Sequence, residues 1–325
     1  MDYEIVATLG PSSDSEVTWR AMLATGVTAF RLNTSHLTLP QLTDWIGRLS
    51  TFLAARDPRP PLILDLQGSK WRLGQLPARE LSAGDRVALV CAESTDRAGA
   101  LPVPHPDFFR AASVSSREIV LNDAKLRLVL ESREADSLSA RVIVGGAIGP
   151  RKGITYSASS YRQESLTVTD RTILQLTRNL PGIRYALSYV KDAPEMGSYR
   201  AQIGRQASLI AKLERQSAVD EARKIAEAAD ELWLCRGDLG AELGTKAMAA
   251  TVYRFSDRVG ELPVPVLLAG QIFEHLAEHP TPTRSEVCAA YDALMKGYHG
   301  LVLSDETAIG RNPIESCRIA ALFRS

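Results

Sequence analysis

The chain has no excess of charge of either sign, because its 38 basic and 38 acidic residues leave a formal net charge of zero. No overall field therefore attracts it to nucleic acid or to an anionic membrane. It also lacks a long apolar run, whereas a membrane span needs about 20 residues. The first residues carry no basic segment of the kind that opens a secretory signal. We therefore expect a cytoplasmic protein with small-molecule partners and with neither nucleic acid nor membrane as a partner.

Cysteine is scarce, and the four cysteines are far apart: Cys91, Cys235, Cys288 and Cys317. No C-x-x-C pair is present, so neither a zinc site nor a disulfide framework is indicated. We expect these side chains to act as small apolar residues.

The length of 325 residues exceeds a usual single domain. It matches an α/β barrel of about 250 residues together with one modest insertion. Short β-rich runs alternate with amphipathic helical segments, such as Ser217 to Ala229, which is typical of βα units around a parallel sheet. Eight such strands are predicted: Glu4–Leu9, Thr28–Leu32, Leu62–Leu66, Tyr185–Val190, Ser208–Leu213, Glu231–Cys235, Pro265–Ala269 and Gly300–Leu303.

The alternation breaks between the third and fourth strands, where residues 72–152 change character. Period-two runs replace it at Arg86–Cys91, Ile119–Leu121, Leu126–Glu131 and Ala140–Val144. A structureless loop of this length is uncommon in a compact domain. We predict a (β/α)8 TIM barrel built from residues 1–71 and 153–325, with a small all-β lid domain inserted at 72–152.

Charged side chains gather where the predicted barrel strands end, which is where such barrels carry their chemistry. Lys212 and Glu214 close the fifth strand, and Asp238 follows the sixth. Two carboxylates with no nitrogen or sulfur ligand suit Mg²⁺ or Mn²⁺, and a neighbouring lysine can neutralise a phosphate or an enolate. A simple salt bridge between Lys212 and Glu214 is the structural alternative.

Further motifs follow the other strands: T-L-G-P-S at 8–12, R-L-N-T-S-H at 31–36, L-D-L-Q-G-S-K at 64–70, R-G-D-L-G at 236–240 and S-D-E-T at 304–307. In this order, with an insertion after the third strand, they resemble the pyruvate kinase family from Ile5 to the end of the chain. The inserted segment I-V-L-N-D at 119–123, the R-K-G-I at 151–154 and the P-T-R-S-E at 282–286 add to the resemblance.

The resemblance implies roles for individual residues. Glu214 and Asp238 would hold the divalent metal, Lys212 and Arg31 would stabilise phosphoryl transfer, and the helix-opening amides of Gly237 and Asp238 would seat a substrate carboxylate. The substrates implied are phosphoenolpyruvate or another 2-keto acid, with ADP or ATP. The positions that match nucleotide contacts are Pro11, Arg31, Asn33, His36, Arg72 and Lys152.

Some of these residues also fit ordinary surface positions. Arg31 and Asn33 could belong to a solvated loop, and His36 and Lys152 could lie in loops by chance. His275 and His279 stand four residues apart, but without an H-E-x-x-H order or a third ligand they are better explained as helix-surface residues.

The monovalent-cation site of the family is altered here. Asn33, Ser35 and Asp65 match its ligands, but Leu66 replaces a threonine, Gln67 a lysine and Lys70 a glutamate. An ammonium near Asp65 can supply the positive charge that K⁺ supplies elsewhere. We therefore expect that K⁺ is not required.

A second departure follows the seventh strand, where the family's A-T-Q-M reads A-G-Q-I, with Gly270 in place of the threonine. The resemblance links that hydroxyl to protonation of the enolpyruvate carbon, and a positioned proton donor contributes roughly 10² to 10⁴-fold. The lid's return also differs, reading K-G-I-T-Y-S-A at 152–158 where the family has K-G-V-N-L-P-G.

The sequence stops at Ser325, without the C-terminal regulatory domain of the family, so we expect no allosteric control by sugar phosphates and leave homo-oligomerisation open. The leading hypothesis is a Mg²⁺-dependent phosphotransferase. A lyase or aldolase acting on a pyruvate-type enolate, suggested by Gly270, is the alternative. A degenerate nucleotide- or keto-acid-binding homologue is a third possibility, disfavoured by retention of the charged cluster.

Overall fold

The computed structural model describes residues 1–112, 118–121, 126–134, 137–156 and 166–324. Its contacts divide the chain into two compact units. The first contains residues 1–67, 166–236 and 250–325, and the second contains residues 68–165 and 237–249. The predicted lid boundaries at 72 and 152 fall inside the longer segment of the second unit.

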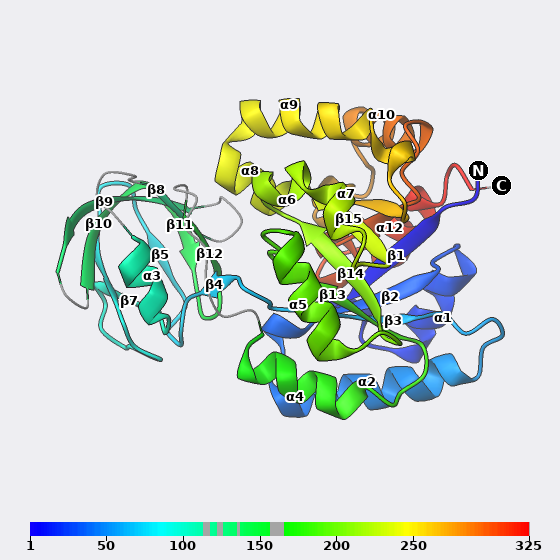
Figure 1. Cartoon of the computed structure of the whole chain (residues 1–325), viewed down its shortest axis with the longest axis horizontal. Coiled ribbons are helices and arrows are strands. Elements are labelled where there is room, and N and C mark those ends of the chain that lie inside the picture. The colour runs from blue at the N-terminus through cyan, green and yellow to red at the C-terminus, as the bar shows by residue number, and fades with distance from the viewer. Residues whose placement is uncertain (113–117, 122–125, 135–136, 157–165, 325) are drawn as a thin grey trace. The chain divides into compact units, whose positions relative to one another are not determined.

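The first unit is a closed barrel of eight parallel strands in the order β1-β17-β16-β15-β14-β13-β3-β2. Helices surround these strands (Figure 1). The strands are β1 (Glu4–Leu9), β2 (Ala29–Asn33), β3 (Leu62–Leu66), β13 (Ile183–Leu187), β14 (Ser208–Leu213), β15 (Glu231–Cys235), β16 (Val266–Ala269) and β17 (Gly300–Leu303). The predicted (β/α)8 barrel is thus confirmed, and five of its strands have the predicted bounds.

The barrel strands are apolar on both faces, because one face packs inside the barrel and the other under the helices. Interior residues come from all around the sheet and include Val6, Ala29, Ile63, Ala186, Ile210, Trp233 and Val302. Buried layers of this kind fill the centre of the barrel, so that chemistry is confined to its ends.

The helical elements of the barrel differ in length. The longer ones are α1 (Glu16–Ala24), α2 (Leu39–Ala54), α4 (Val168–Thr177), α5 (Ala193–Ile203), α10 (Arg284–Met295) and α12 (Pro313–Ala320). Short elements are η1 (Pro11–Ser13), η2 (Thr34–His36), α6 (Gln216–Asp220), α7 (Ala222–Ile225), η3 (Val259–Glu261), η4 (Glu274–Ala277) and α11 (Asp305–Ala308). The helices α8 (Arg236–Leu243) and α9 (Thr245–Ser256) cross the boundary between the units. The Met1 ammonium donates to the Phe323 carbonyl at 3.1 Å, which joins the two ends of the chain.

Several local predictions are wrong. The second strand lies at Ala29–Asn33 rather than Thr28–Leu32, and the seventh begins at Val266 rather than Pro265. The fourth strand begins at Ile183 rather than Tyr185. The fourth strand ends at Leu187 rather than Val190, because Tyr189 adopts a left-handed φ of 64° that cannot continue a strand. The helix predicted at 217–229 is two short helices, α6 and α7, separated at Glu221. Glu221 leaves helical dihedrals, and its carboxylate accepts the Ala193 amide of α5 at 3.1 Å.

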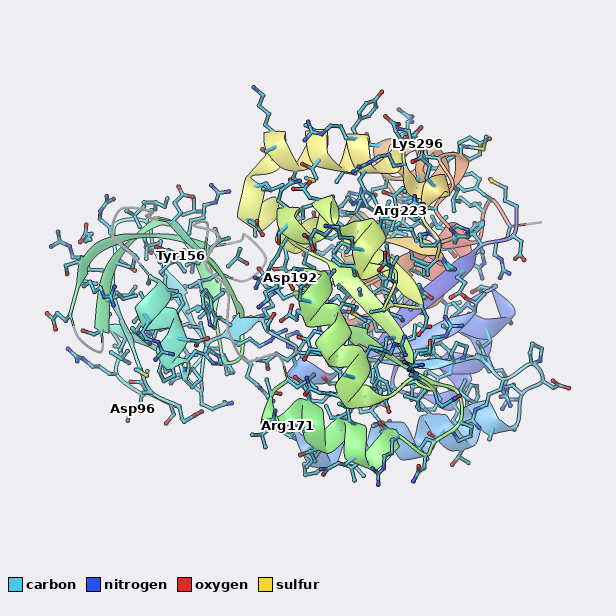
Figure 2. All side chains as sticks on the ribbon, in the orientation of Figure 1. Asp96, Tyr156, Arg171, Asp192, Arg223 and Lys296 are labelled. Carbon is cyan, nitrogen blue, oxygen red and sulfur yellow. The ribbon has the colours of Figure 1, made fainter. Side chains whose placement is uncertain are left out.

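The second unit contains a seven-stranded sheet in the order β4-β12-β8-β9-β10-β6-β7 and a separate β5-β11 pair. Its elements are β4 (Trp71–Arg72), β5 (Arg79–Leu81), β6 (Arg86–Val90), β7 (Ala100–Pro102), α3 (Pro106–Ala111), β8 (Glu118–Leu121), β9 (Leu126–Arg133), β10 (Ser137–Val144), β11 (Gly146–Ile148) and β12 (Gly153–Tyr156). Tyr156, labelled in Figure 2, packs edge-on against Phe108 of α3 with ring centroids 6.4 Å apart. This unit therefore has its own hydrophobic core.

No helix within the described residues is both long enough and apolar enough to cross a membrane.

Candidate active site at the barrel mouth

Asp65, the fourth residue of β3, is the centre of a charged cluster in the barrel. Its Oδ2 accepts hydrogen bonds from Arg31 Nε at 2.8 Å and from Arg31 Nη2 at 2.5 Å. The ammonium of Lys212 lies 3.0 Å from the same oxygen. Asp65 is only 2% exposed, so a single buried carboxylate joins two cations that come from β2 and β14.

Neutral hydroxyl groups complete this cluster. Ser188, just beyond β13, donates to Asp65 Oδ1 at 2.9 Å and accepts from the Lys212 ammonium at 3.0 Å. Thr8 of β1 accepts from Arg31 Nη1 at 2.8 Å and donates to the Leu303 carbonyl at 2.6 Å. Each cation is therefore held from more than one strand, which limits the rotamers it can adopt.

Opposite charges determine the protonation states in the cluster. Burial by itself raises the pKa of Asp65, but the neighbouring Lys212 and Arg31 charges outweigh it and hold that pKa below its usual range. Burial likewise disfavours the charged form of Lys212, but the carboxylates of Asp65 and Glu214 raise its pKa above the ordinary value. Lys212 is consequently a cation at neutral pH and can stabilise negative charge, whereas it cannot serve as a base.

Glu214 directly follows β14 and is 3% exposed. Its Oε1 lies 3.1 Å from the Lys212 ammonium, so the salt bridge considered for this pair is present. Its Oε2 accepts the backbone amide of Tyr189 at 2.7 Å. The left-handed backbone of Tyr189 therefore presents its amide to a carboxylate of the cluster.

Sequence reasoning missed Ser188 and Tyr189, because the fourth strand was extended through both. The only available signal was a serine in the segment that follows a barrel strand. It also missed Cys235, which ends β15 and is 6% exposed. Burial first, and then the Glu214 carboxylate, raise the pKa of Cys235, so its thiol stays neutral.

Asp238 belongs to the second unit and lies in the first turn of α8, which follows β15 directly. The ammonium of Lys70, in the same unit, lies 2.7 Å from its Oδ1 and 2.6 Å from its Oδ2. The expectation that the Lys70 ammonium acts near Asp65 stays a prediction; within its own unit Lys70 pairs with Asp238, while Arg31 and Lys212 neutralise Asp65. Gly68, with a φ of 57°, turns the chain between β3 and Lys70.

Carboxylates are the only strong metal donors among the predicted ligands. Glu214 and Asp238 follow β14 and β15, which pair in parallel with Lys212 opposite Trp233. An all-oxygen donor set fits Mg²⁺ or Mn²⁺, which take few protein ligands and keep water and substrate oxygens. No group of three or more His, Cys, Asp or Glu side chains suited to a metal occurs in the described part of the chain.

The predicted nucleotide-binding residues divide between the units. Pro11 opens η1, Asn33 accepts the Ser35 amide at 3.3 Å, and His36 ends η2, all in the first unit. Arg72 and Lys152 lie in the second unit, where the Leu73 amide donates to the Lys152 carbonyl at 2.9 Å. Arg72 Nη1 donates to the Arg151 carbonyl at 3.0 Å. Of the motifs quoted for the lid, Asn122, Asp123, Ser157 and Ala158 lie outside the described residues.

The loop after β16 has a specific backbone conformation. Gly270 and Gln271 have φ values of 83° and 56°, in the left-handed region that favours glycine. The guanidinium of Arg236 donates to the Gly270 carbonyl at 3.0 and 2.8 Å and to the Gln271 carbonyl at 2.8 Å. Arg236 thus fixes this loop, and Gly237 after it contributes its amide to the opening turn of α8.

His275 and His279 lie side by side. Their rings stack face to face, with centroids 3.9 Å apart and an interplanar angle of 13°. His275 Nδ1 lies 2.8 Å from the Thr281 carbonyl oxygen. His275 lies on η4, whereas His279 is exposed beyond the end of that element at Ala277, so the prediction of two helix-surface residues is wrong for His279.

Comparison with known proteins adds an independent line of evidence. Residues 2–317 match the family model described as the barrel domain of pyruvate kinase. The chain belongs to the pyruvate kinase family. A pyruvate kinase of Agrobacterium vitis is 30% identical over 319 residues, and that of Aeropyrum pernix is 32% identical over 327 residues. Pyruvate kinase 2 of Synechocystis is 31% identical over 330 residues.

The three alignments cover 97%, 99% and 98% of this chain but 66%, 70% and 55% of the respective relatives. The chain therefore spans between 55% and 70% of the length of these relatives. All three relatives are named as kinases, and they give no support to the lyase or aldolase alternative.

Proposed function

We propose that the chain catalyses Mg²⁺-dependent phosphoryl transfer between phosphoenolpyruvate and ADP, in either direction. The observation that carries this proposal is the buried cluster in which Asp65 holds Arg31 and a protonated Lys212 together. Two fixed cations are suited to the spread negative charge of a transferring phosphoryl group, where catalysis consists mainly of positioning and charge neutralisation.

The remaining groups are assigned from their positions and from the family. Glu214 and Asp238 are the proposed metal ligands, and the bound metal would neutralise phosphate and enolate oxygens. The Gly237 and Asp238 amides are proposed to bind the substrate carboxylate, because the first amides of a helix have no intrahelical acceptor. Pro11, Asn33, His36, Arg72 and Lys152 are the proposed nucleotide contacts, with Gly270 next to the substrate.

A coupled assay of pyruvate formed from phosphoenolpyruvate and ADP tests this function. We expect turnover that requires Mg²⁺ and that falls by about 10²-fold or more in Lys212→Met, because a pre-positioned charge is removed. Lys224→Met is the matched control, since Lys224 lies on α7 with its side chain 70% exposed. Folded protein that forms no pyruvate above background, or equal loss in both variants, would refute the proposal.

We further propose that turnover does not need K⁺. Two cations already neutralise Asp65, one of the positions that match the family's K⁺ ligands, and Lys70 adds a further buried ammonium to the chain. Replacing K⁺ by tetramethylammonium at constant ionic strength should leave kcat within about twofold, since the fixed charges remain. Strong stimulation on restoring K⁺ would show that this expectation is wrong.

A further inference from the structure

The ammonium of Lys70 contacts both carboxylate oxygens of Asp238, as a bound cation would. Its ammonium lies almost equally far from the two carboxylate oxygens, at 2.7 and 2.6 Å. Lys70 is 5% exposed and Asp238 is 9% exposed. A buried pair at such distances is strongly attractive because little water screens it.

The chain makes room for this lysine at Gly153, the first residue of β12. A Cβ at position 153 would lie 2.4 Å from Lys70 Cε and 2.9 Å from its Nζ. Gly153 of β12 pairs with Arg72 of β4, and Lys70 lies two residues before Arg72. The Lys70 side chain therefore lies against the backbone of β12 at Gly153. Any larger residue would force the ammonium away from its present position.

We propose that Lys70 is an internal counter-ion that competes with the divalent cation for Asp238. This inference depends on the proposed function, in which Asp238 is a metal ligand. An ammonium bound to both oxygens and a divalent ion bound to either repel each other. Metal binding therefore requires the Lys70 ammonium to move. Lys70 neutralises Asp238 when no metal is bound, and it weakens the affinity of Asp238 for the divalent cation.

Binding of Mn²⁺ in the absence of substrates tests the competition directly, with free Mn²⁺ measured by electron paramagnetic resonance. Lys70→Met should bind Mn²⁺ about tenfold more tightly than the wild type, a factor that corresponds to about 1.4 kcal/mol. Lys246→Met is the control for loss of one positive charge, because Lys246 is exposed and lies in the same unit. It should leave the affinity unchanged.

A second variant retains the lysine. Gly153→Ala should also tighten Mn²⁺ binding, because its new Cβ displaces the ammonium while the charge stays in the chain. The Lys70→Met protein loses a buried partner, so its melting temperature is measured with and without Mn²⁺. Mn²⁺ should raise that temperature more than it does for the wild type. Unchanged or weaker Mn²⁺ binding in both variants would overturn the inference.

The double variant Lys70→Met/Asp238→Asn separates the two proposals. Tighter binding in Lys70→Met that is abolished in the double variant supports both the competition and the metal assignment. Binding abolished in the double variant, but unchanged by Lys70→Met and Gly153→Ala, overturns the competition alone. Equal Mn²⁺ binding by Lys70→Met and the double variant would show that Asp238 is not a metal ligand. That result would overturn both the metal assignment and the competition.

Discussion

At the scale of single residues, the charged cluster in the barrel is balanced. Arg31 and Lys212 contribute two positive charges, and Asp65 and Glu214 contribute two negative charges. Removing one member leaves an uncompensated buried charge, which typically destabilises a protein by about 3 to 5 kcal/mol. Substitutions of these four residues therefore mix effects on stability with effects on catalysis, and a neutral neighbour is a cleaner probe of positioning.

Ser188 is that neighbour, because its hydroxyl bonds both Asp65 and Lys212. Ser188→Ala should lower kcat by about tenfold, since a misdirected Lys212 loses about 1.4 kcal/mol of transition-state stabilisation, and leave the KM for ADP unchanged. Ser188→Thr, which keeps a hydroxyl, should recover part of the loss. Both constants are measured in the coupled assay.

The control for Ser188→Ala is Ser316→Ala. Ser316 is also buried, and its hydroxyl donates to the backbone carbonyls of Glu306 and Asn312. Loss of this hydroxyl should lower stability by about 1 kcal/mol without changing kcat. If both alanine variants reduce kcat to the same extent, Ser188 has no specific positioning role.

At the scale of elements, loop conformations at the strand ends are decisive. After β13 the left-handed Tyr189 directs its amide to Glu214, and after β16 the left-handed Gly270 and Gln271 are held by Arg236. Side chains with a branched Cβ are strained in this region by about 1 to 2 kcal/mol. Glycine at position 270 therefore removes strain from the loop as well as a hydroxyl group.

Gly270→Thr tests the effect of a threonine hydroxyl at this position. Gly270→Val is the control, because valine has the same shape as threonine without the hydroxyl. Both variants should lose about 1 to 2 kcal/mol of unfolding free energy, because both require a strained φ. Only threonine offers a hydroxyl, so it should exchange the methyl protons of pyruvate with D₂O roughly 10²-fold faster than valine. Proton NMR measures the exchange, and equal rates would contradict a role for the hydroxyl at this position.

At the scale of the whole molecule, buried acids make stability depend on pH. Burial raises the pKa of Glu306 to about 7, although the Ser304 amide donates to its carboxylate at 2.9 Å. Burial, followed by the nearby Glu4 carboxylate, raises the pKa of Glu231 to about 7. Glu231 of β15 accepts a hydrogen bond at 3.2 Å from Arg184 of β13, which links two barrel strands, and another from Trp233 Nε1 of its own strand.

A carboxyl group whose pKa is higher in the folded state stabilises the fold when protonated. This contribution is fully present below the ordinary glutamate pKa of about 4.5 and is lost as pH rises through about 7. The unfolding free energy, measured with denaturant, should therefore decrease between about pH 5 and pH 7.5. Glu306→Gln should flatten this dependence, because Gln does not titrate. An unchanged slope in that variant would contradict the raised pKa of Glu306.

Much of the fold could be predicted from the sequence, because barrel strands buried on both faces consist of short apolar runs. Such a run can be recognised without knowing which strand it pairs with. Bounds at Glu4–Leu9, Leu62–Leu66, Ser208–Leu213 and Glu231–Cys235 follow from such runs. The strand-end motifs likewise identified the family, the residues Arg31 and Lys212 that the structure brings to Asp65, and Glu214, which pairs with Lys212. These properties are local and need no knowledge of what lies opposite.

Only the tertiary structure decided the pairing of Lys70 with Asp238, the turn at Ser188 and Tyr189, and the break between α6 and α7 at Glu221. Each depends on partners far away in the sequence: the residue numbers of Lys70 and Asp238 differ by 168, and those of Glu221 and Ala193 by 28. Patterns of hydrophobicity carry no information about such partners or about the sign of φ at a single residue. The sequence therefore determined which charged groups stand at the strand ends, and three-dimensional contacts determined which of them neutralise each other.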